Sequence, residues 1–518
     1  MRARRSAAAA ASVAVLGLLA GCGTTAQLNG SSVGASNAQG GLGLQAPGAG
    51  RGQSAGAGAL GSSGAGPAGA GGGVTGSSGS GAGTFGGPGA GSGTAGTSSA
   101  EGGAGGGAAA PSPNPAAPRT TGPLNIGVLY SQNTAAQSAL GVNTNTSLDS
   151  STIAQALINW YNAHGGIVGR HLTAVYNGFG ADDPSYQTDL QAACAKFTQD
   201  NHVSEVLDLA GAYDPSFQQC LTTAHTPYVG YTVSDDVDMG SFPGFVNPSD
   251  RSLDDRVRAV LGVLAGTGYL SRSNKLGVVY ETCPNTTRAL QRTLEPYATS
   301  LHLNVAKTFG IDCVTGFSSA GPGAAELQQA VLQFQSAGVD RVTFVSNYES
   351  AVILLFARDA ENAGYRPGYA LSSNAGAGIP GGNIPTAQMQ NFHGVGWQPL
   401  GDVNSTDPVS PAGSRCLQIT SSENVHPGSP SDYSLIYQAC ETFFFLETVL
   451  QSTHGAADWS SFIGAVNSLG SAFQSTISLG GATQVSSGRH AGASEAAPFA
   501  FSNGCQCMKY SGPAQHFL

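Results

Sequence analysis

The chain has 518 residues, of which only 10% are charged, and its formal net charge at pH 7 is −10. This negative balance argues against a nucleic-acid partner, which would need a basic surface. Low charge with 76 glycines is partly a property of one N-terminal stretch, so the composition says little about other partners.

Residues 1–22 have the pattern of an export signal that ends in a lipidation site. Arginines open the segment, residues 7–18 form an apolar run, and Leu19-Ala20-Gly21-Cys22 has the form of a lipobox. The apolar run is too short to span a bilayer as a permanent helix. We expect Cys22 to become the lipidated first residue, anchored to the outer face of the cell membrane. An ordinary secretory signal with a chance cysteine is the alternative.

Residues 23–121 consist almost wholly of Gly, Ala, Ser, Thr and Pro. Such a composition cannot bury enough apolar surface to offset its ordering entropy, so we expect a disordered tether. As a flexible coil it would span roughly 50–60 Å. The tether could let an anchored domain reach a membrane partner, or it could be a tolerated insertion without a length requirement.

Eight cysteines remain after Cys22, and an even number in an exported chain indicates disulfides. Eight cysteines allow 105 connectivities. We favour pairing in sequence order, because each consecutive pair lies within one predicted supersecondary unit. The cysteines are Cys194, Cys220, Cys283, Cys313, Cys416, Cys440, Cys505 and Cys507.

Residues 124–180 predict the opening βαβ unit of an α/β domain. Leu124, Ile126 and Val128 alternate as the inward face of a strand, and residues 153–161 carry apolar side chains at helical spacing. Gly165-Gly166 then supplies the positive-φ positions at which the helix ends.

Within this unit, residues 158–172 (INWYNAHGGIVGRHL) resemble the N-x-x-GG-[IV]-x-GR signature of type I periplasmic binding proteins. These are the branched-chain amino-acid (Leu/Ile/Val) substrate-binding subunits of ABC importers. The likeness covers roughly residues 122 to 515 in the order of its elements. It implies an α/β fold of two lobes, each a doubly wound parallel sheet, with a hinged cleft between them.

Strands and helices continue to alternate after this unit, which favours parallel sheets with helices on both faces. Nearly 400 ordered residues exceed what one core holds, so two lobes are expected. The resemblance implies that later helices return to the first lobe. The expected division is 122–248 for the first part of lobe 1, 249–402 for lobe 2, 403–478 for the return to lobe 1 and 479–518 for a C-terminal crossing segment.

A ligand in such a fold lies outside the carboxyl ends of the strands, between the lobes. The loops that meet this condition supply the candidate ligand-binding residues. They are Ser131, Gln132, Ala212, Tyr213, Thr232, Ser234, Glu281, Asn347, Tyr348 and Asn374.

The resemblance implies that Thr232 and Ser234 hold a ligand carboxylate, together with the loop that carries Tyr213. In the family, an acid in the loop that matches Asn374 grips the ammonium group of the ligand. Asparagine cannot pair with a buried cation, which makes an unmodified α-amino acid doubtful. Glu281 could substitute if it points inward; otherwise a neutral or anionic small molecule is favoured.

Other chemistries have weaker signals. Outside the glycine-rich residues 23–121 the chain contains no G-x-S-x-G motif, and it contains no H-E-x-x-H or P-loop motif anywhere. His490 and His516 with Cys505 and Cys507 could be imagined as a copper or zinc site, although a C-x-C pair in an exported chain is better explained by oxidation. We therefore expect no metal, no cofactor and no enzymatic activity.

These observations favour a lipid-anchored solute-binding protein, monomeric, that captures a small molecule and delivers it to an ABC permease. One alternative is a ligand sensor of the same fold that signals to a membrane receptor. Another is an extracytoplasmic hydrolase on this scaffold.

Overall fold

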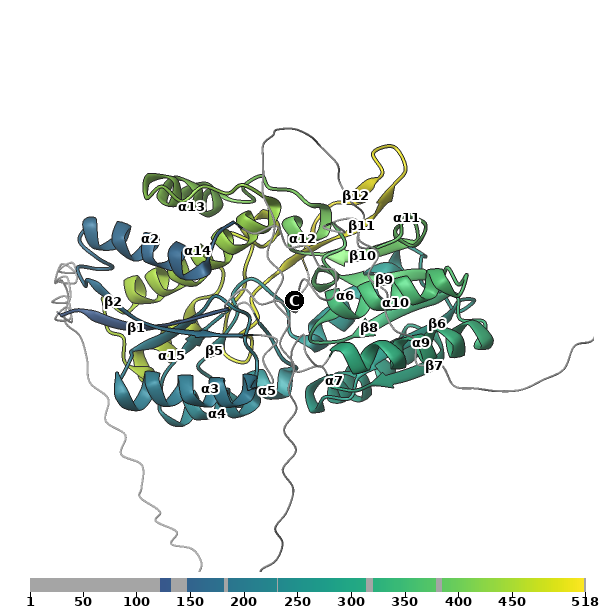
Figure 1. Cartoon of the computed structure of the whole chain (residues 1–518), viewed down its shortest axis with the longest axis horizontal. Helices are drawn as coiled ribbons and strands as arrows, with labels where there is room; N and C mark the ends of the chain where they lie inside the picture. The colour runs from purple at the N-terminus through teal and green to yellow at the C-terminus, as the bar shows by residue number, and fades with distance from the viewer. Residues whose placement is uncertain are drawn as a thin grey trace, which may run out of the picture. The chain divides into compact units, whose positions relative to one another are not determined.

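The computed structural model describes residues 122–131, 147–180, 185–230, 232–313, 320–378 and 384–516 (Figure 1). The predicted export signal with Cys22, the tether and the candidate site residue Gln132 lie outside these ranges. Within the described ranges, no helix is both long and apolar enough to cross a membrane.

Five parallel strands form the first sheet, in the order β2-β1-β3-β4-β5. Leu124, Ile126 and Val128 turn to one face and Leu129 to the other, so β1 is buried on both sides. Since β1 lies between β2 and β3, a topological switch point lies between β1 and β3. The strands are β1 (Leu124–Ser131), β2 (Leu172–Phe179), β3 (Glu205–Asp208), β4 (Tyr228–Val229) and β5 (Phe245–Val246).

Helices cover both faces of the first sheet, and together they form the first lobe (Figure 1). Phe443 and Phe445 share one core cluster with Ile126 and Leu157, so α14 packs on this sheet. The helices on this face are α2 (Ser150–Ala163), α13 (Pro411–Ser422), α14 (Pro430–Ser452) and α15 (Trp459–Ser468). The opposite face carries α3 (Tyr186–Ala195), the π-helical turn η1 (Lys196–Asp200), α4 (Pro215–Thr223) and α5 (Asp236–Ser241).

The second sheet has the strand path β12-β11-β10-β9-β8-β6-β7. Its strands from β7 to β10 are parallel, with a switch point between β6 and β8. The C-terminal segment adds the antiparallel strands β11 and β12, which makes the sheet mixed rather than purely parallel. The strands are β6 (Lys275–Glu281), β7 (Asn304–Ile311), β8 (Arg341–Val345), β9 (Gly368–Ser372), β10 (Phe392–Gly396), β11 (Glu495–Ser502), β12 (Cys507–Tyr510) and β13 (Gln515–His516), which pairs with β11.

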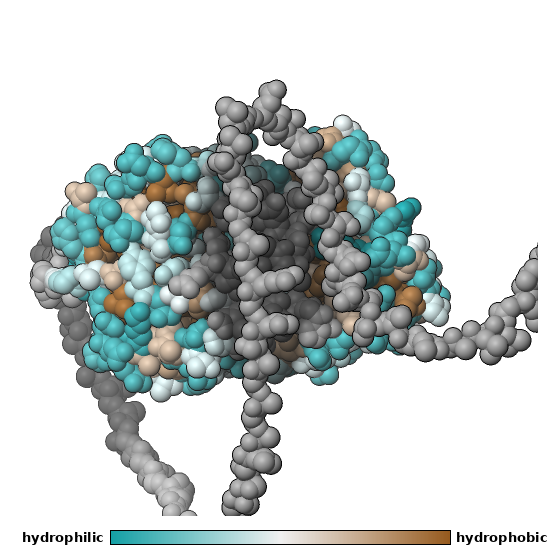
Figure 2. Space-filling view, viewed as in Figure 1, coloured by the Kyte–Doolittle hydropathy of each residue, from teal (hydrophilic) through white to brown (hydrophobic). Residues whose placement is uncertain are grey.

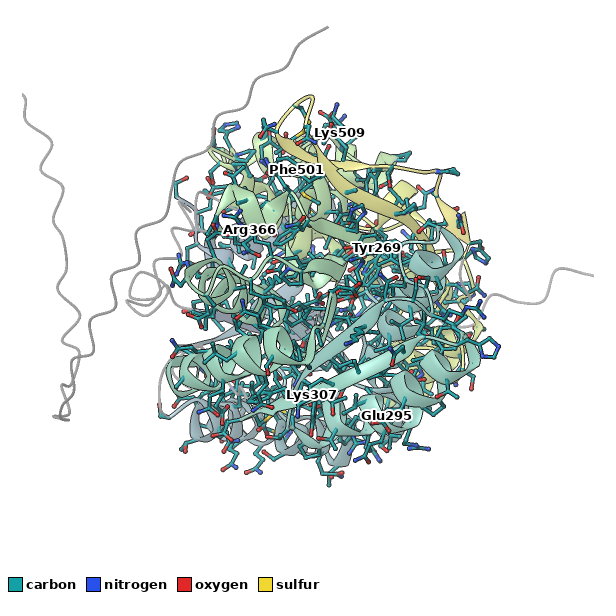
Figure 3. All side chains as sticks on the ribbon, turned by 90° about the vertical axis from the view of Figure 1, so that its right-hand side faces the viewer. Tyr269, Glu295, Lys307, Arg366, Phe501 and Lys509 are labelled. Carbon is teal, nitrogen blue, oxygen red and sulfur yellow. A yellow bond between two sulfur atoms is a disulfide. The ribbon has the colours of Figure 1, made fainter. Side chains whose placement is uncertain are left out.

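Helices also cover both faces of the second sheet, and together they form the second lobe. Figure 3 shows Lys307 of β7 and Lys509 of β12 at opposite ends of this lobe, as expected for its two edge strands. One face carries α6 (Leu253–Gly266), α7 (Pro284–Ala289), η2 (Leu290–Leu294) and α8 (Glu295–Ser300), and the other carries α9 (Ala320–Ala337), α10 (Glu349–Asn362) and α11 (Thr386–Met389). Shorter elements are η4 (Ser373–Ala375), α12 (Pro399–Val403) and η5 (Leu479–Gly481).

The chain crosses between the lobes after β5, after β10 and before β11. Buried Asp250 joins all three crossings. Its Oδ1 accepts a hydrogen bond from Trp397 Nε1 at 2.8 Å, and its Oδ2 pairs with Arg256 Nη2 at 2.7 Å. The backbone N–H of Ala493 donates to the Asp250 carbonyl oxygen at 2.9 Å. One carboxylate residue therefore sets the spacing of the hinge segments.

The glycine-arginine turn has a structural role in the first lobe. Gly165 and Gly166 have φ values of 88° and 78°, as predicted, and a Cβ on Gly166 would lie 2.0 Å from the Arg170 carbonyl oxygen. The Arg170 guanidinium donates to the carbonyl oxygens of Gly122 and Gly455. The turn thereby fixes the start of β1 beside the loop that follows α14.

Apolar residues lie as small, separate patches on the face that Figure 2 presents. Among the described residues, the large apolar side chains exposed by more than a third are Val237 (37%) and Leu332 (54%). Single exposed apolar residues are normal on protein surfaces. The monomeric state stays a prediction.

The eight cysteines form four disulfides in the expected sequence order. Cys416–Cys440 joins two helices in the buried core of the first lobe. Cys505–Cys507 lies at the exposed turn between β11 and β12, where the two thiols imagined as metal ligands bond to each other instead. The pairs are Cys194–Cys220, Cys283–Cys313, Cys416–Cys440 and Cys505–Cys507.

These positions predict unequal contributions to stability. Replacing Cys416 and Cys440 by serine is expected to lower the free energy of unfolding by about 3 kcal/mol, because this disulfide restrains a long loop in the unfolded chain. Replacing Cys505 and Cys507 should cost about half as much, since that disulfide closes a very short loop. Urea unfolding of both double variants without reductant measures the difference. Equal losses would contradict this assignment.

Candidate functional site

Loops at the carboxyl ends of both sheets contact each other across the lobes. The first lobe contributes Tyr213 after β3 and Ser234 after β4, and the second contributes Asn285 after β6 and Asn347 after β8. Asn285 Nδ2 donates to Ser234 Oγ at 3.0 Å and to Asn347 Oδ1 at 2.9 Å. Ser234 Oγ donates to the Tyr213 hydroxyl at 2.7 Å. We call these four residues the interlobe cluster. It brings together three of the predicted site residues, and Asn285 is the member that the sequence analysis missed.

An ion-pair network lies beside the interlobe cluster. Arg288 of α7 in the second lobe pairs with two carboxylates of the first lobe, at 2.6 Å from Nε to Asp235 Oδ2 and at 2.6 Å from Nη2 to Asp238 Oδ1. The hydrogen bond to Asp235 is the main cause that raises the pKa of Arg288. Asp238 Oδ2 also accepts from the Tyr213 hydroxyl at 2.5 Å.

Asp235, Asp238 and Arg288 are not among the predicted site residues. Their positions at the starts of helices are the sequence signal that could have identified them. Asp235 precedes a short helix as its N-cap, and Arg288 follows Pro284 on the first turns of the helix after β6. Both places are helix starts beside the carboxyl ends of strands, where ligand and interlobe contacts gather.

The loop after β3 binds a carboxylate of its own chain. Asp208 accepts hydrogen bonds from the backbone N–H groups of Ala210 at 2.8 Å and Ala212 at 2.9 Å, and from the Tyr228 hydroxyl. Burial of Asp208 raises its pKa to about 7. The N–H group of Ala212, a predicted ligand contact, is therefore used within the first lobe.

Glu281 has the same arrangement in the second lobe. Its side chain is fully buried, and it accepts hydrogen bonds from the Ser346 hydroxyl and from the backbone N–H of Asn347, at 3.2 Å. Burial raises its pKa to about 7. Glu281 does not point inward in the way that a substitute ammonium partner would need, because both oxygens bond to the loop after β8.

Asn374 lies next to a cation. With its amide oxygen turned toward Arg256, that oxygen accepts hydrogen bonds from Nη1 at 3.1 Å and from Nη2 at 2.8 Å. Arg256 is 6% exposed and pairs with Asp250. A ligand ammonium group at Asn374 would therefore approach a guanidinium rather than an acid.

The remaining predicted site residues among those described are Tyr348, Thr232 and Ser131. The Tyr348 hydroxyl bonds to that of Tyr186 across the lobes, and burial raises the pKa of Tyr348 to about 12. Thr232 has a half-buried side chain, and its carbonyl oxygen accepts from Asn247 Nδ2 at 3.1 Å. Ser131 ends β1 and is half-buried. Direct ligand contact by any of these residues stays a prediction.

A cavity of about 20 Å³ lies under the loop after β8, lined in part by Arg256, Ser346 and Glu349. This volume holds about one water molecule. A solute inserted between Ser234 and Asn285 must replace the hydrogen bond that joins them. Its binding free energy must exceed that of the contacts it displaces.

Known structures share this architecture at low sequence identity. A branched-chain amino-acid ABC transporter protein from Thermus thermophilus with bound valine has a TM-score of 0.56, with 13% identity over 77% of this chain and 98% of its own. A solute-binding protein from R. palustris in complex with 4-hydroxybenzoate has a TM-score of 0.53, with 11% identity over 76% and 97%. A possible leucine/isoleucine/valine-binding protein from Rhodopirellula baltica has a TM-score of 0.54, with 16% identity over 77% and 98%.

No family model and no curated protein sequence matches the chain. The likeness to the solved structures shows the fold, which is the two-lobed α/β fold of type I periplasmic binding proteins. The fold predicted from the sequence is therefore confirmed.

The buried carboxyl groups predict an unusual dependence of stability on pH. Burial raises the pKa of Asp208 and Glu281 to about 7 and that of Glu205 to about 8, whereas carboxyl groups in unfolded chains have a pKa of about 4. At a pH between the unfolded and the folded pKa, these groups take up protons when the chain folds. The free energy of unfolding therefore falls as the pH rises from about 4 to about 7 or 8. Carboxyl groups with a lowered pKa, such as Asp458 at about 2, titrate below this window.

The unfolding temperature is therefore expected to be higher at pH 5.5 than at pH 8.0, by on the order of 5 °C. Replacing Glu205 by glutamine should raise the unfolding temperature at pH 8.0 and reduce the difference. Scanning calorimetry at both pH values measures the effect. An unfolding temperature that is constant or rises over this range would contradict the assigned burial.

Proposed function

We propose that this chain is the solute-binding subunit of an ABC importer, which captures a small molecule between its lobes and presents it to a membrane permease. The fold supports this proposal, because the solved structures that share it include an ABC transporter protein with bound valine and a solute-binding protein in complex with 4-hydroxybenzoate. Capture needs no catalytic group. The solute shifts the equilibrium between the open and closed arrangements of the lobes. The permease responds to this shift.

The observation that carries the proposal is the direct hydrogen bond between Ser234 of the first lobe and Asn285 of the second, at 3.0 Å. Both side chains are buried and have capacity to donate and to accept. A solute inserted between them gains hydrogen bonds from both lobes at once. Such a solute stabilises the closed arrangement more than the open one, which is the requirement for ligand-driven closure.

The proposed place of action is the outer face of the cell membrane, and it rests on the N-terminal sequence. The lipobox Leu19 to Cys22 would supply the anchor, and residues 23–121 would supply the reach.

Lipidation at Cys22 has a direct test. In a bacterial host that processes lipoproteins, the full chain should incorporate radiolabelled palmitate and remain with the membranes. The Cys22→Ser variant should take up no label and be found in the soluble exported fraction. An unlabelled, soluble wild-type protein would instead indicate an ordinary secretory signal.

The interlobe site can be tested with a library of amino acids, aromatic acids, amides and sugars, screened by thermal shift. For any compound that binds, replacing Ser234 or Asn285 by alanine should weaken binding about tenfold, because a buried hydrogen bond contributes about 1 kcal/mol or more. Ser241→Ala is the matched control, since its exposed hydroxyl bonds within α5. Equal affinity in all three variants would place the site elsewhere.

A further inference from the structure

We infer that the interlobe site selects an uncharged, hydrogen-bonding solute, such as an amide, a phenol or a polyol, and that Asp208 and Glu281 exclude anions from it. This inference rests on the proposed function and narrows the class of solute. The reason is that backbone donors and charged side chains near the interlobe cluster already have partners within the chain.

Anion sites at the carboxyl ends of parallel strands are built from backbone N–H groups without a partner. In the first lobe, the carboxylate of Asp208 accepts hydrogen bonds from the N–H groups of Ala210 and Ala212. These two donors are thereby bound to a carboxylate of the chain itself and do not hold an anionic solute.

The second lobe repeats this arrangement twice. Glu281 accepts from the backbone N–H of Asn347 at 3.2 Å, and Glu349 accepts from the backbone N–H of Ser372 at 3.0 Å. Asn374 donates its own N–H to the Ser372 hydroxyl at 3.1 Å. An anion between the lobes would find these three N–H groups occupied, two of them by carboxylates of the chain.

Arg288 is the cation beside the interlobe cluster, with a side chain that is 30% exposed. Its guanidinium already pairs with both Asp235 and Asp238. The guanidinium is therefore already neutralised within the chain, so Arg288 does not attract an anion into the site.

A cationic or zwitterionic solute also lacks a partner. Two carboxylates among the described residues contact the interlobe cluster. Glu281 bonds to the loop after β8 through both oxygens. Asp238 bonds to Arg288 through Oδ1, and its Oδ2 accepts from the hydroxyls of Tyr213 and Ser234. Asn374 faces the guanidinium of Arg256, which repels an ammonium group. A buried charge without a partner is costly, so both ends of an amino acid are disfavoured.

Within the interlobe cluster, as far as the structure describes the site, the groups left for a solute are hydroxyls and amides. Ser234, Tyr213, Asn285 and Asn347 bond to one another, and each can exchange that partner for a neutral hydroxyl or amide group without leaving a charge unpaired. The chemistry of the interlobe cluster therefore matches an uncharged polar molecule.

The test uses probes of one shape and different charge at pH 8.0, measured by isothermal titration calorimetry. The first set is 4-methylpentanamide, 4-methylpentanoate, 4-methylpentan-1-amine and leucine, and the second is 4-hydroxybenzamide and 4-hydroxybenzoate. A yeast-extract digest covers other shapes. It is passed at low pH over a strong cation exchanger, which retains amino acids with the cations, and then over an anion exchanger, and the neutral, anionic and cationic pools are assayed by thermal shift. We expect a neutral probe to bind at least tenfold more tightly than its charged partners, or the neutral pool alone to raise the unfolding temperature.

Tighter binding of a charged probe, or stabilisation by a charged pool, would overturn the inference and leave the proposed function standing. Stabilisation by no pool together with binding of no probe would overturn both.

A variant pair tests the part assigned to the two carboxylates. The double variant Asp208→Asn with Glu281→Gln removes both charges and should bind the anionic probes at least tenfold more tightly than the wild type. Glu205→Gln is the matched control, because Glu205 is as buried as Asp208 but lies at the opposite end of β3. Circular dichroism melting checks that the variants fold, and an unchanged affinity for anions in a folded double variant would overturn the role of Asp208 and Glu281.

Discussion

The buried side chain of Asp250 is the constraint on which the two-lobed arrangement depends. It accepts from Trp397 at the second crossing and pairs with Arg256 at the first, while its backbone carbonyl holds Ala493 at the third. A buried carboxylate with partners on several segments is costly to disturb, so the segments stay in register. Arg256 in turn reaches Asn374 at the edge of the proposed site. The hinge and the site are therefore connected through one guanidinium.

Buried carboxylates are the second recurring device of this fold. Asp208, Glu281 and Glu349 each lie near the carboxyl end of a strand and accept the backbone N–H groups of a neighbouring loop. Such internal bonds shape the loops before any solute arrives, which lowers the ordering cost of binding. They also remove the donors with which the same architecture would grip an anion. Stability at neutral pH is reduced as a consequence, because burial raises the pKa of these groups.

The sequence was sufficient to predict the fold but not the centre of the site. Alternating apolar residues in β1 and the glycine turn at Gly165 are local patterns, and the structure has both. The pairing of Arg288 with Asp235 joins residues of different lobes, and no periodicity of the sequence encodes such a contact. The sequence indicates Glu281 as a ligand partner because this residue lies at the end of a strand. Its direction depends on Ser346 and the loop after β8, which a strand pattern cannot reveal.

The central claim is that a small molecule is held between the lobes, and native mass spectrometry tests it most directly. Protein purified from its exporting host, as residues 119–518 without lipid, would be measured before and after denaturation. The account predicts that a small molecule leaves the protein on denaturation, and that Asn285→Ala protein carries less of it. A single mass with no released molecule, together with no shift on incubation with the solute library, would contradict capture between the lobes.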